Sequence, residues 1–300
     1  MLTPFGKALR QLRVDKGLKL LDVADALGVS SAYVSAIETG RKAVPDGLVT
    51  DLRRGLNLNE AERNALRRAA DQTRKEVSVD SLHADQRELV AAFARKLDDL
   101  PDELLESIRT KVLKSLSSEH PFARKRRGMV VAPMSIDAIR NFSEKVRAAF
   151  TKKKEIKFPI IEVLEFKLEK LIPDFYLDVR EEDELGDVEG LVVSGQNTLC
   201  LRRDVYDQAC ADHGRARFTA CHELGHFLMH RSVALARLRD DDVPIYCDSE
   251  WQADTFAGAL MMSSKHCHLF QNADEAASSC GMSKAAAQHQ LKLYRSKPRK

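Results

Sequence analysis

The most constraining feature of the sequence is the run Cys221-His222-Glu223-Leu224-Gly225-His226, which lies in a stretch predicted to be helical. Residues four apart stand one turn apart on the same helix face, so the imidazoles of His222 and His226 can bind one metal ion, usually zinc. Glu223 is then positioned as general base for a water molecule beside the metal. With nine histidines in 300 residues, the pattern arises by chance in roughly 2% of such chains, so it needs support from its context.

Support comes from a second predicted helix, which opens with residues 248–254. A catalytic zinc needs a third protein ligand and one open position, and Glu250 is the candidate ligand. Asp254 lies on the same face four residues later, where it can hold a ligating histidine in place. Cys247 is a candidate inhibitory thiol because its sulfur could occupy the open position; the alternative is an ordinary packed thiol.

The stretch CHELGHFLMH and the later EWQADTFAGALMM together resemble the ImmA/IrrE family of zinc metallopeptidases. The resemblance covers about residues 135–300 and implies an α+β, zincin-like domain that holds Zn²⁺. It also implies that His222, His226 and Glu250 are the zinc ligands and that Glu223 is the general base of peptide hydrolysis.

The N-terminal part contains short amphipathic helices that end at Gly17, Gly28 and Gly40. Residues 5–57, and above all 17–41, resemble the XRE/Cro–CI helix-turn-helix family, whose second motif helix lies in the major groove of double-stranded operator DNA. The residues expected to contact DNA are Lys19, Ser31, Ala32, Tyr33, Ser35, Arg41 and Lys42. The alternative is a helix-turn-helix fold that is retained for protein contacts alone.

The pattern divides the chain into four segments: a mainly α helix-turn-helix domain (1–75), a helical segment (76–116), a linker (117–134) and the peptidase domain (135–300). The helical segment is either a dimerisation and regulatory element of a homodimer or a simple domain extension. Residues 1–128 carry 24 Lys and Arg against 19 Asp and Glu, whereas residues 129–300 carry 24 against 26. The front part is therefore the one suited to a polyanion.

No apolar run approaches the roughly 18 residues that a membrane-spanning helix needs, and the N-terminus lacks the apolar core of a secretion signal. All six cysteines lie after residue 199 without a CxxC pair, so a disulfide scaffold is not expected. We therefore expect a cytoplasmic protein with no membrane contact.

Together the two halves predict a transcriptional repressor coupled to a zinc endopeptidase. Cleavage within segment 80–128, in the same chain or a twin, would relieve repression under a stress or DNA-damage signal. One alternative is a non-catalytic regulator of the antitoxin or phage type, which uses the peptidase fold as a sensor or partner surface. Another is a protease of unrelated proteins that the helix-turn-helix tethers to DNA.

Overall fold

The computed structural model describes residues 2–45, 47–73, 129–152, 155–193, 196–230 and 244–295. Within these ranges, five helices form the N-terminal domain: α1 (Pro4–Lys16), α2 (Leu20–Leu27), α3 (Ser31–Glu38), α4 (Leu48–Leu56) and α5 (Glu60–Thr73). The predicted segment 76–116 lies outside the described residues.

Capping residues begin α1 and α3, and glycines end α1 and α2, as the sequence predicts for Gly17 and Gly28. Thr3 caps α1 by accepting a hydrogen bond from the Gly6 N–H (3.0 Å), and Ser30 caps α3 in the same way through the Tyr33 N–H (3.0 Å). Gly17 and Gly28 end α1 and α2 with positive φ angles of 65° and 69°, which glycine adopts without strain.

No single helix in the described residues is long and apolar enough to cross a membrane. Helices α2 and α3 together reach the required length and composition, but they meet at 109°.

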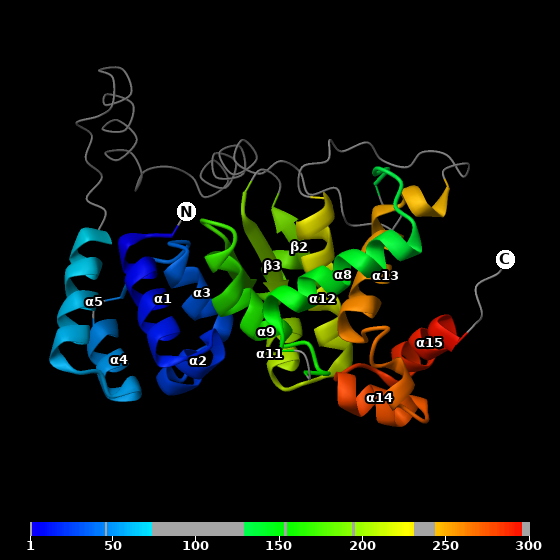
Figure 1. Cartoon of the computed structure of the whole chain (residues 1–300). Coiled ribbons are helices and arrows are strands. Elements are labelled where there is room, and N and C mark those ends of the chain that lie inside the picture. The colour runs from blue at the N-terminus through cyan, green and yellow to red at the C-terminus, as the bar shows by residue number, and fades with distance from the viewer. Residues whose placement is uncertain are drawn as a thin grey trace, which may run out of the picture.

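The C-terminal part is α+β, as predicted. Its three-stranded sheet has the order β1-β3-β2, with β1 (Tyr176–Arg180) parallel and β2 (Gly190–Val193) antiparallel to β3 (Thr198–Arg202). The helices around it are α8 (Ile136–Phe150), α9 (Ile160–Glu162), α10 (Glu182–Leu185), α11 (Arg203–Cys210), α12 (Gly214–His230), α13 (Ser249–Met261), α14 (Ala273–Cys280) and α15 (Lys284–Arg295). Figure 1 shows α12 between the sheet and α13.

The helical segment 160–170 is not one continuous α-helix. After α9 the chain forms a π-helical turn (Val163–Lys167) and then a 3₁₀ turn (Leu168–Lys170). The π turn carries Glu165, which is buried and accepts hydrogen bonds from Arg13 and Tyr206. The irregular turn therefore coincides with a polar contact between the two halves of the chain.

The predicted linker 117–134 ends earlier than expected. Residue 128 and those before it in this segment lie outside the described residues, but 129–134 pair with the chain that leads into α13. The Met129 N–H donates to Ser249 Oγ (2.9 Å), and the Val131 N–H donates to the Cys247 carbonyl (2.9 Å). Backbone pairing of this kind makes 129–134 part of the peptidase domain.

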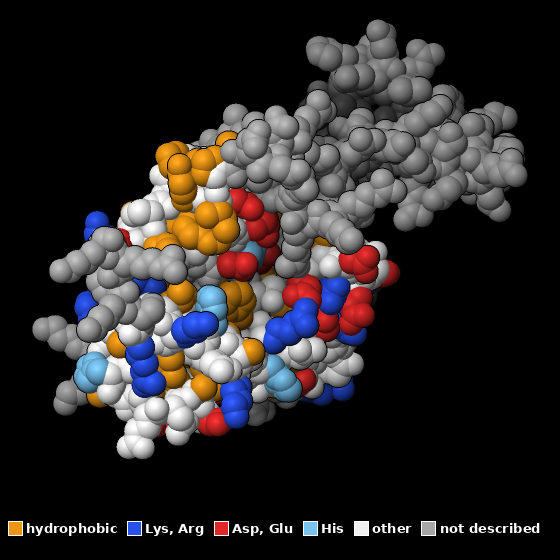
Figure 2. Space-filling model, turned by 90° about the vertical axis from the view of Figure 1, so that its right-hand side faces the viewer, with side chains coloured by type: hydrophobic (Ala, Val, Ile, Leu, Met, Phe, Trp, Pro, Cys, Tyr) orange, Lys and Arg blue, Asp and Glu red, His pale blue; other side chains and the backbone are white. Residues whose placement is uncertain are grey.

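The two domains share one hydrophobic core, and α3 packs directly on β1 (Figure 1). Figure 2 shows the end of the peptidase domain that lies away from the N-terminal helices. Acidic, basic and apolar side chains all appear among the described residues of this face.

Candidate functional site

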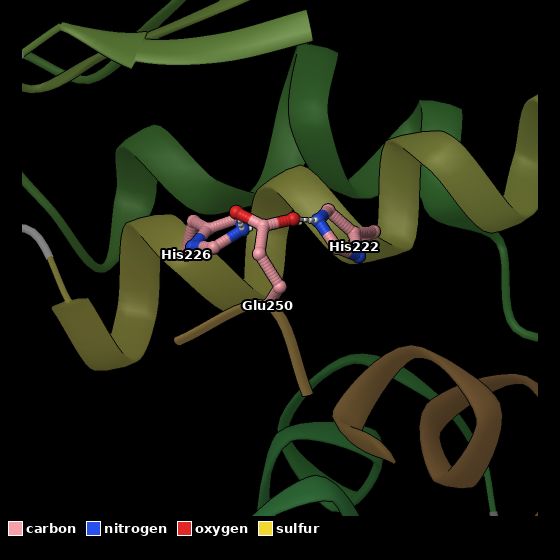
Figure 3. Close-up of side chains that lie close together, drawn as sticks. All are labelled: His222, His226 and Glu250. Atoms are coloured by element: carbon pink, nitrogen blue, oxygen red, sulfur yellow. Dashed lines mark hydrogen bonds and ion pairs between the residues drawn. The ribbon is translucent and has the colours of Figure 1, made fainter. Parts of the chain in front are cut away.

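Two adjacent helices bring the predicted metal ligands together. His222 and His226 project from α12, and Glu250 projects from the first turn of α13 (Figure 3). Asp248 caps α13 by accepting the Glu250 N–H (2.9 Å), so the Glu250 carboxylate lies at the positive end of the helix dipole. Gly225 allows the close approach of α13, because a Cβ atom there would lie 2.9 Å from Phe256 Cδ1.

The donor atoms of the three residues lie close enough together to share one metal ion, and the two imidazole Nε2 atoms are 2.9 Å apart. Each oxygen of Glu250 faces one imidazole, at 3.4 Å from His222 Nε2 and 3.3 Å from His226 Nε2 (Figure 3). In a tetrahedron with bonds of about 2.0–2.1 Å, ligand atoms lie about 3.3 Å apart. Two imidazoles and one carboxylate leave a fourth position open, so these residues fit a catalytic zinc ion.

His222 is held from behind by Asp254, as the sequence predicts for this carboxylate. The distance from His222 Nδ1 to Asp254 Oδ1 is 2.8 Å. Burial lowers the pKa of His222, but the hydrogen bonds to Asp254 and Glu250 outweigh it and raise the pKa to about 10. The Nδ1–H···carboxylate bond leaves Nε2 as the atom that faces the metal position.

His226 is held by a hydrogen-bond relay that the sequence analysis missed. Gln252 Nε2 donates to the carbonyls of Ala132 and Tyr246 (both 2.8 Å), so its Oε1 is the atom that accepts from His230 Nε2 (2.9 Å). His230 Nδ1 then accepts from His226 Nδ1 at 3.1 Å, which leaves His226 Nε2 free for a metal. The signal for His230 was its position one helical turn after His226.

The pKa of His230 agrees with this relay. Burial lowers it to about 4, so the imidazole is neutral near pH 7 and can accept through one nitrogen while it donates through the other. The relay begins at Ala132, so residues 129–134 help to orient a candidate metal ligand.

Glu223 lies on α12 between the two histidines and is only 9% exposed. Strand β2 runs close beside it, because a Cβ atom at Gly190 would lie 2.6 Å from Glu223 Cγ. Glycine at this position therefore makes room for the candidate general base. The contact joins residues 33 apart in sequence, so local sequence patterns do not reveal it.

Cys247 does not join the metal cluster. In the described part of the chain, the group of potential ligand atoms within 4.8 Å of one another comprises His222, His226 and Glu250 alone. Cys247 ends a short 3₁₀ turn (Ile245–Cys247) and is half-buried. Its role as an inhibitory thiol stays a prediction.

Three of the predicted DNA contacts, Ser31, Ser35 and Arg41, bind carboxylates of the peptidase domain. Ser31, Ala32 and Ser35 are each 1% exposed, Tyr33 and Lys19 are half-buried, and Arg41 is ion-paired with Asp178 and Glu184. Lys42 is exposed, with its Nζ 4.9 Å from the centre of the Tyr33 ring. The DNA-contacting role of these seven residues stays a prediction.

The chain matches two family models. Residues 4–66 match a helix-turn-helix domain, and residues 176–292 match the IrrE N-terminal-like domain of the M78 peptidases. Neither the comparison with curated proteins nor that with solved structures gives a significant match. The protein therefore joins a helix-turn-helix DNA-binding domain to an IrrE N-terminal-like peptidase domain, which confirms both resemblances.

Replacing Asp254 with alanine is expected to weaken zinc binding by about 10- to 100-fold, because His222 loses the partner that fixes its tautomer and orientation. Competition with a chromophoric zinc chelator measures the affinity. Asp274→Ala removes an exposed carboxylate paired with Lys284, and it should leave the affinity unchanged. Equal affinities in the two variants would contradict the supporting role of Asp254.

Proposed function

We propose that the protein is a cytoplasmic, homodimeric transcriptional repressor that is also a zinc-dependent endopeptidase. It cleaves its own segment 80–128, or that of a twin chain, and so relieves repression under a stress or DNA-damage signal. The observation that carries the enzymatic part is the convergence of His222, His226 and Glu250 beside the buried Glu223.

The chemistry expected of this site is hydrolysis of a peptide bond. A bound Zn²⁺ ion supplies Lewis acidity, which polarises the substrate carbonyl and lowers the pKa of a water molecule to about 7. The Glu223 carboxylate accepts the proton of the attacking water and passes it to the leaving amine. Asp254 and His230 keep the two imidazoles in the orientation that a metal requires.

The position of residue 129 supports self-cleavage. The Ser249 N–H donates to the Met129 carbonyl (3.0 Å), and Ser249 directly precedes the candidate ligand Glu250. Residue 129, which follows the proposed substrate segment in sequence, therefore lies beside the residue that precedes Glu250. Separating the helix-turn-helix domain from a dimerising segment lowers operator affinity, because two half-sites are no longer bound by one linked molecule.

Intact-mass spectrometry of the zinc-loaded chain tests this proposal. The protein is incubated alone and with double-stranded or single-stranded DNA, beside a sample kept with a zinc chelator. We expect a pair of fragments that meet within residues 80–128 in the zinc-loaded samples only. A chain that binds zinc and stays whole under every condition would contradict self-cleavage, and a chain that binds no zinc would contradict the enzymatic function.

Replacing Gly190 with alanine is expected to lower the cleavage rate by about 100-fold, because the added Cβ displaces Glu223 by the order of 1 Å. Zinc affinity should be unchanged, since the atoms nearest to the added Cβ belong to Glu223, Leu201 and Cys200 and not to the three ligands. Val193→Ala, a small change in the same strand, is the matched control and should cleave like the wild type. A wild-type cleavage rate in Gly190→Ala would show that the position of Glu223 does not depend on its contact with β2.

A further inference from the structure

The surface with which the helix-turn-helix domain would read DNA is buried against the peptidase domain. The Val179 N–H on β1 donates to Ser35 Oγ (2.8 Å), and Ser35 Oγ donates to Asp178 Oδ1 (3.0 Å). Ser31, Ala32 and Ser35 are each 1% exposed. A recognition helix contacts base edges through its N-terminal residues, so no base can reach α3 while this contact persists.

Two carboxylates of the peptidase domain lie at the N-terminus of α3. Ser30 Oγ donates to Glu181 Oε1 (2.6 Å), and Ser31 Oγ donates to Asp207 Oδ1 (2.7 Å). A helix N-terminus with free hydroxyl donors favours anions because of the helix dipole. In a DNA complex, phosphate oxygens would use the same donors.

Arg41, just after α3, is bound in the same manner. Its Nη1 pairs with Glu184 Oε1 (2.7 Å), and its Nη2 pairs with Asp178 Oδ1 (2.8 Å) and with the Val179 carbonyl (3.0 Å). A guanidinium group whose Nη1 and Nη2 both donate to carboxylates has its charge largely balanced, so it binds phosphate less well while these pairs persist. The peptidase domain thus offers α3 and Arg41 the anionic oxygens that DNA would offer.

We propose that four carboxylates of the peptidase domain, here called the acidic docking surface, compete with double-stranded DNA for the recognition helix. The four residues are Asp178, Glu181, Glu184 and Asp207. The inference rests on the proposed DNA-binding function and adds its regulation. The docked chain is the DNA-free state. The apparent DNA affinity is therefore the affinity of the undocked chain multiplied by the fraction of chains that are undocked. Because docking and DNA binding are thermodynamically linked, DNA must shift the docking equilibrium toward the undocked state by the same factor by which docking lowers the DNA affinity.

The first test weakens docking from the peptidase side and leaves the recognition helix intact. The docking variant combines Glu181→Gln, Glu184→Gln and Asp207→Asn. The charge-matched control combines Glu182→Gln, Asp183→Asn and Asp187→Asn, three exposed residues on the same part of the surface. A fluorescein-labelled 30-base-pair duplex of mixed sequence is titrated at low salt, and fluorescence anisotropy gives the dissociation constant. We expect the docking variant to bind at least tenfold more tightly than the control.

The second test uses the unaltered chain and follows the Val179 amide. Its hydrogen bond to Ser35 Oγ is lost when α3 leaves, so hydrogen exchange in residues 176–180 reports undocking. We expect faster exchange in the docking variant than in the control. In the wild type, exchange should accelerate when the same duplex is added.

Faster exchange together with tighter DNA binding supports the proposal. Faster exchange with a DNA affinity equal to that of the control overturns it, because docking then does not limit DNA binding. DNA binding by the wild type without any change in residues 176–180 overturns it as well. If no chain binds the duplex although exchange shows that α3 is undocked, the proposed DNA-binding function fails, and the inference fails with it.

Discussion

Replacing Glu223 with glutamine is expected to lower the rate of chain cleavage by about 10²- to 10⁴-fold, the contribution typical of a general acid–base residue. The amide has nearly the shape of the carboxylate, so it fits the same space beside Gly190. It cannot accept the proton of the attacking water, and it cannot deliver that proton to the leaving amine. The rate is measured as the fraction of cut chain with time by intact mass, and zinc content is measured by elemental analysis.

The matched control for this variant is Glu189→Gln. Glu189 precedes β2, and its carboxylate contacts Thr219 Oγ1 on α12 at 3.1 Å, outside the metal cluster. We expect Glu189→Gln to retain the wild-type rate and both variants to retain zinc. Unchanged cleavage by Glu223→Gln would show that another group is the general base. Loss of zinc from that variant would show that Glu223 helps to hold the metal.

Replacing Arg13 with alanine is expected to destabilise the protein by about 3–5 kcal/mol, the cost typical of removing one partner from a buried ion pair. Arg13 Nε pairs with Glu38 Oε1 and its Nη1 pairs with Glu165 Oε2, both at 2.7 Å. These side chains are at most 6% exposed, so alanine would leave two buried carboxylates without their cation. The free energy of unfolding is measured by urea denaturation.

Two further variants separate the buried pair from a general effect of charge. Arg63→Ala removes a guanidinium that pairs with the exposed Glu60, and it should change the free energy of unfolding by less than about 1 kcal/mol. Arg13→Lys keeps the charge but loses the planar fork, so its stability should lie between those of the wild type and Arg13→Ala. A loss in Arg13→Ala no larger than in Arg63→Ala would contradict the argument.

Much of the fold was predictable because the signals are local. The two helices that carry the metal ligands lie where the sequence predicts them, since hydrophobic periodicity and capping residues act over a few neighbouring residues. Helix α10 has four residues, and α14 lacks a long apolar period, so neither gave a clear pattern. The π-helical turn after Glu162 coincides with the contact of Glu165, whose partner Arg13 lies 152 residues away in sequence.

The candidate site was predictable in part for the same reason. Helical spacing relates His222 to His226, and Glu250 to Asp254, so these residues could be grouped before the structure was known. The relay through Gln252 to Ala132 joins residues 120 apart, and local patterns carry no information on such a pair. Docking of α3 on β1 is likewise a tertiary contact between segments more than 140 residues apart.

Because α3 binds the acidic docking surface within one chain, the peptide connection between the two domains raises the strength of this docking. While the chain is whole, α3 and its docking surface meet at an effective concentration in the millimolar range, which a linked pair keeps however dilute the protein is. A cut in segment 80–128 turns docking into an ordinary association between two molecules, which dilution opposes. Cleavage would therefore act on operator binding in two opposite ways: it frees α3 from its internal competitor, and it removes the predicted dimerising segment that links two half-sites.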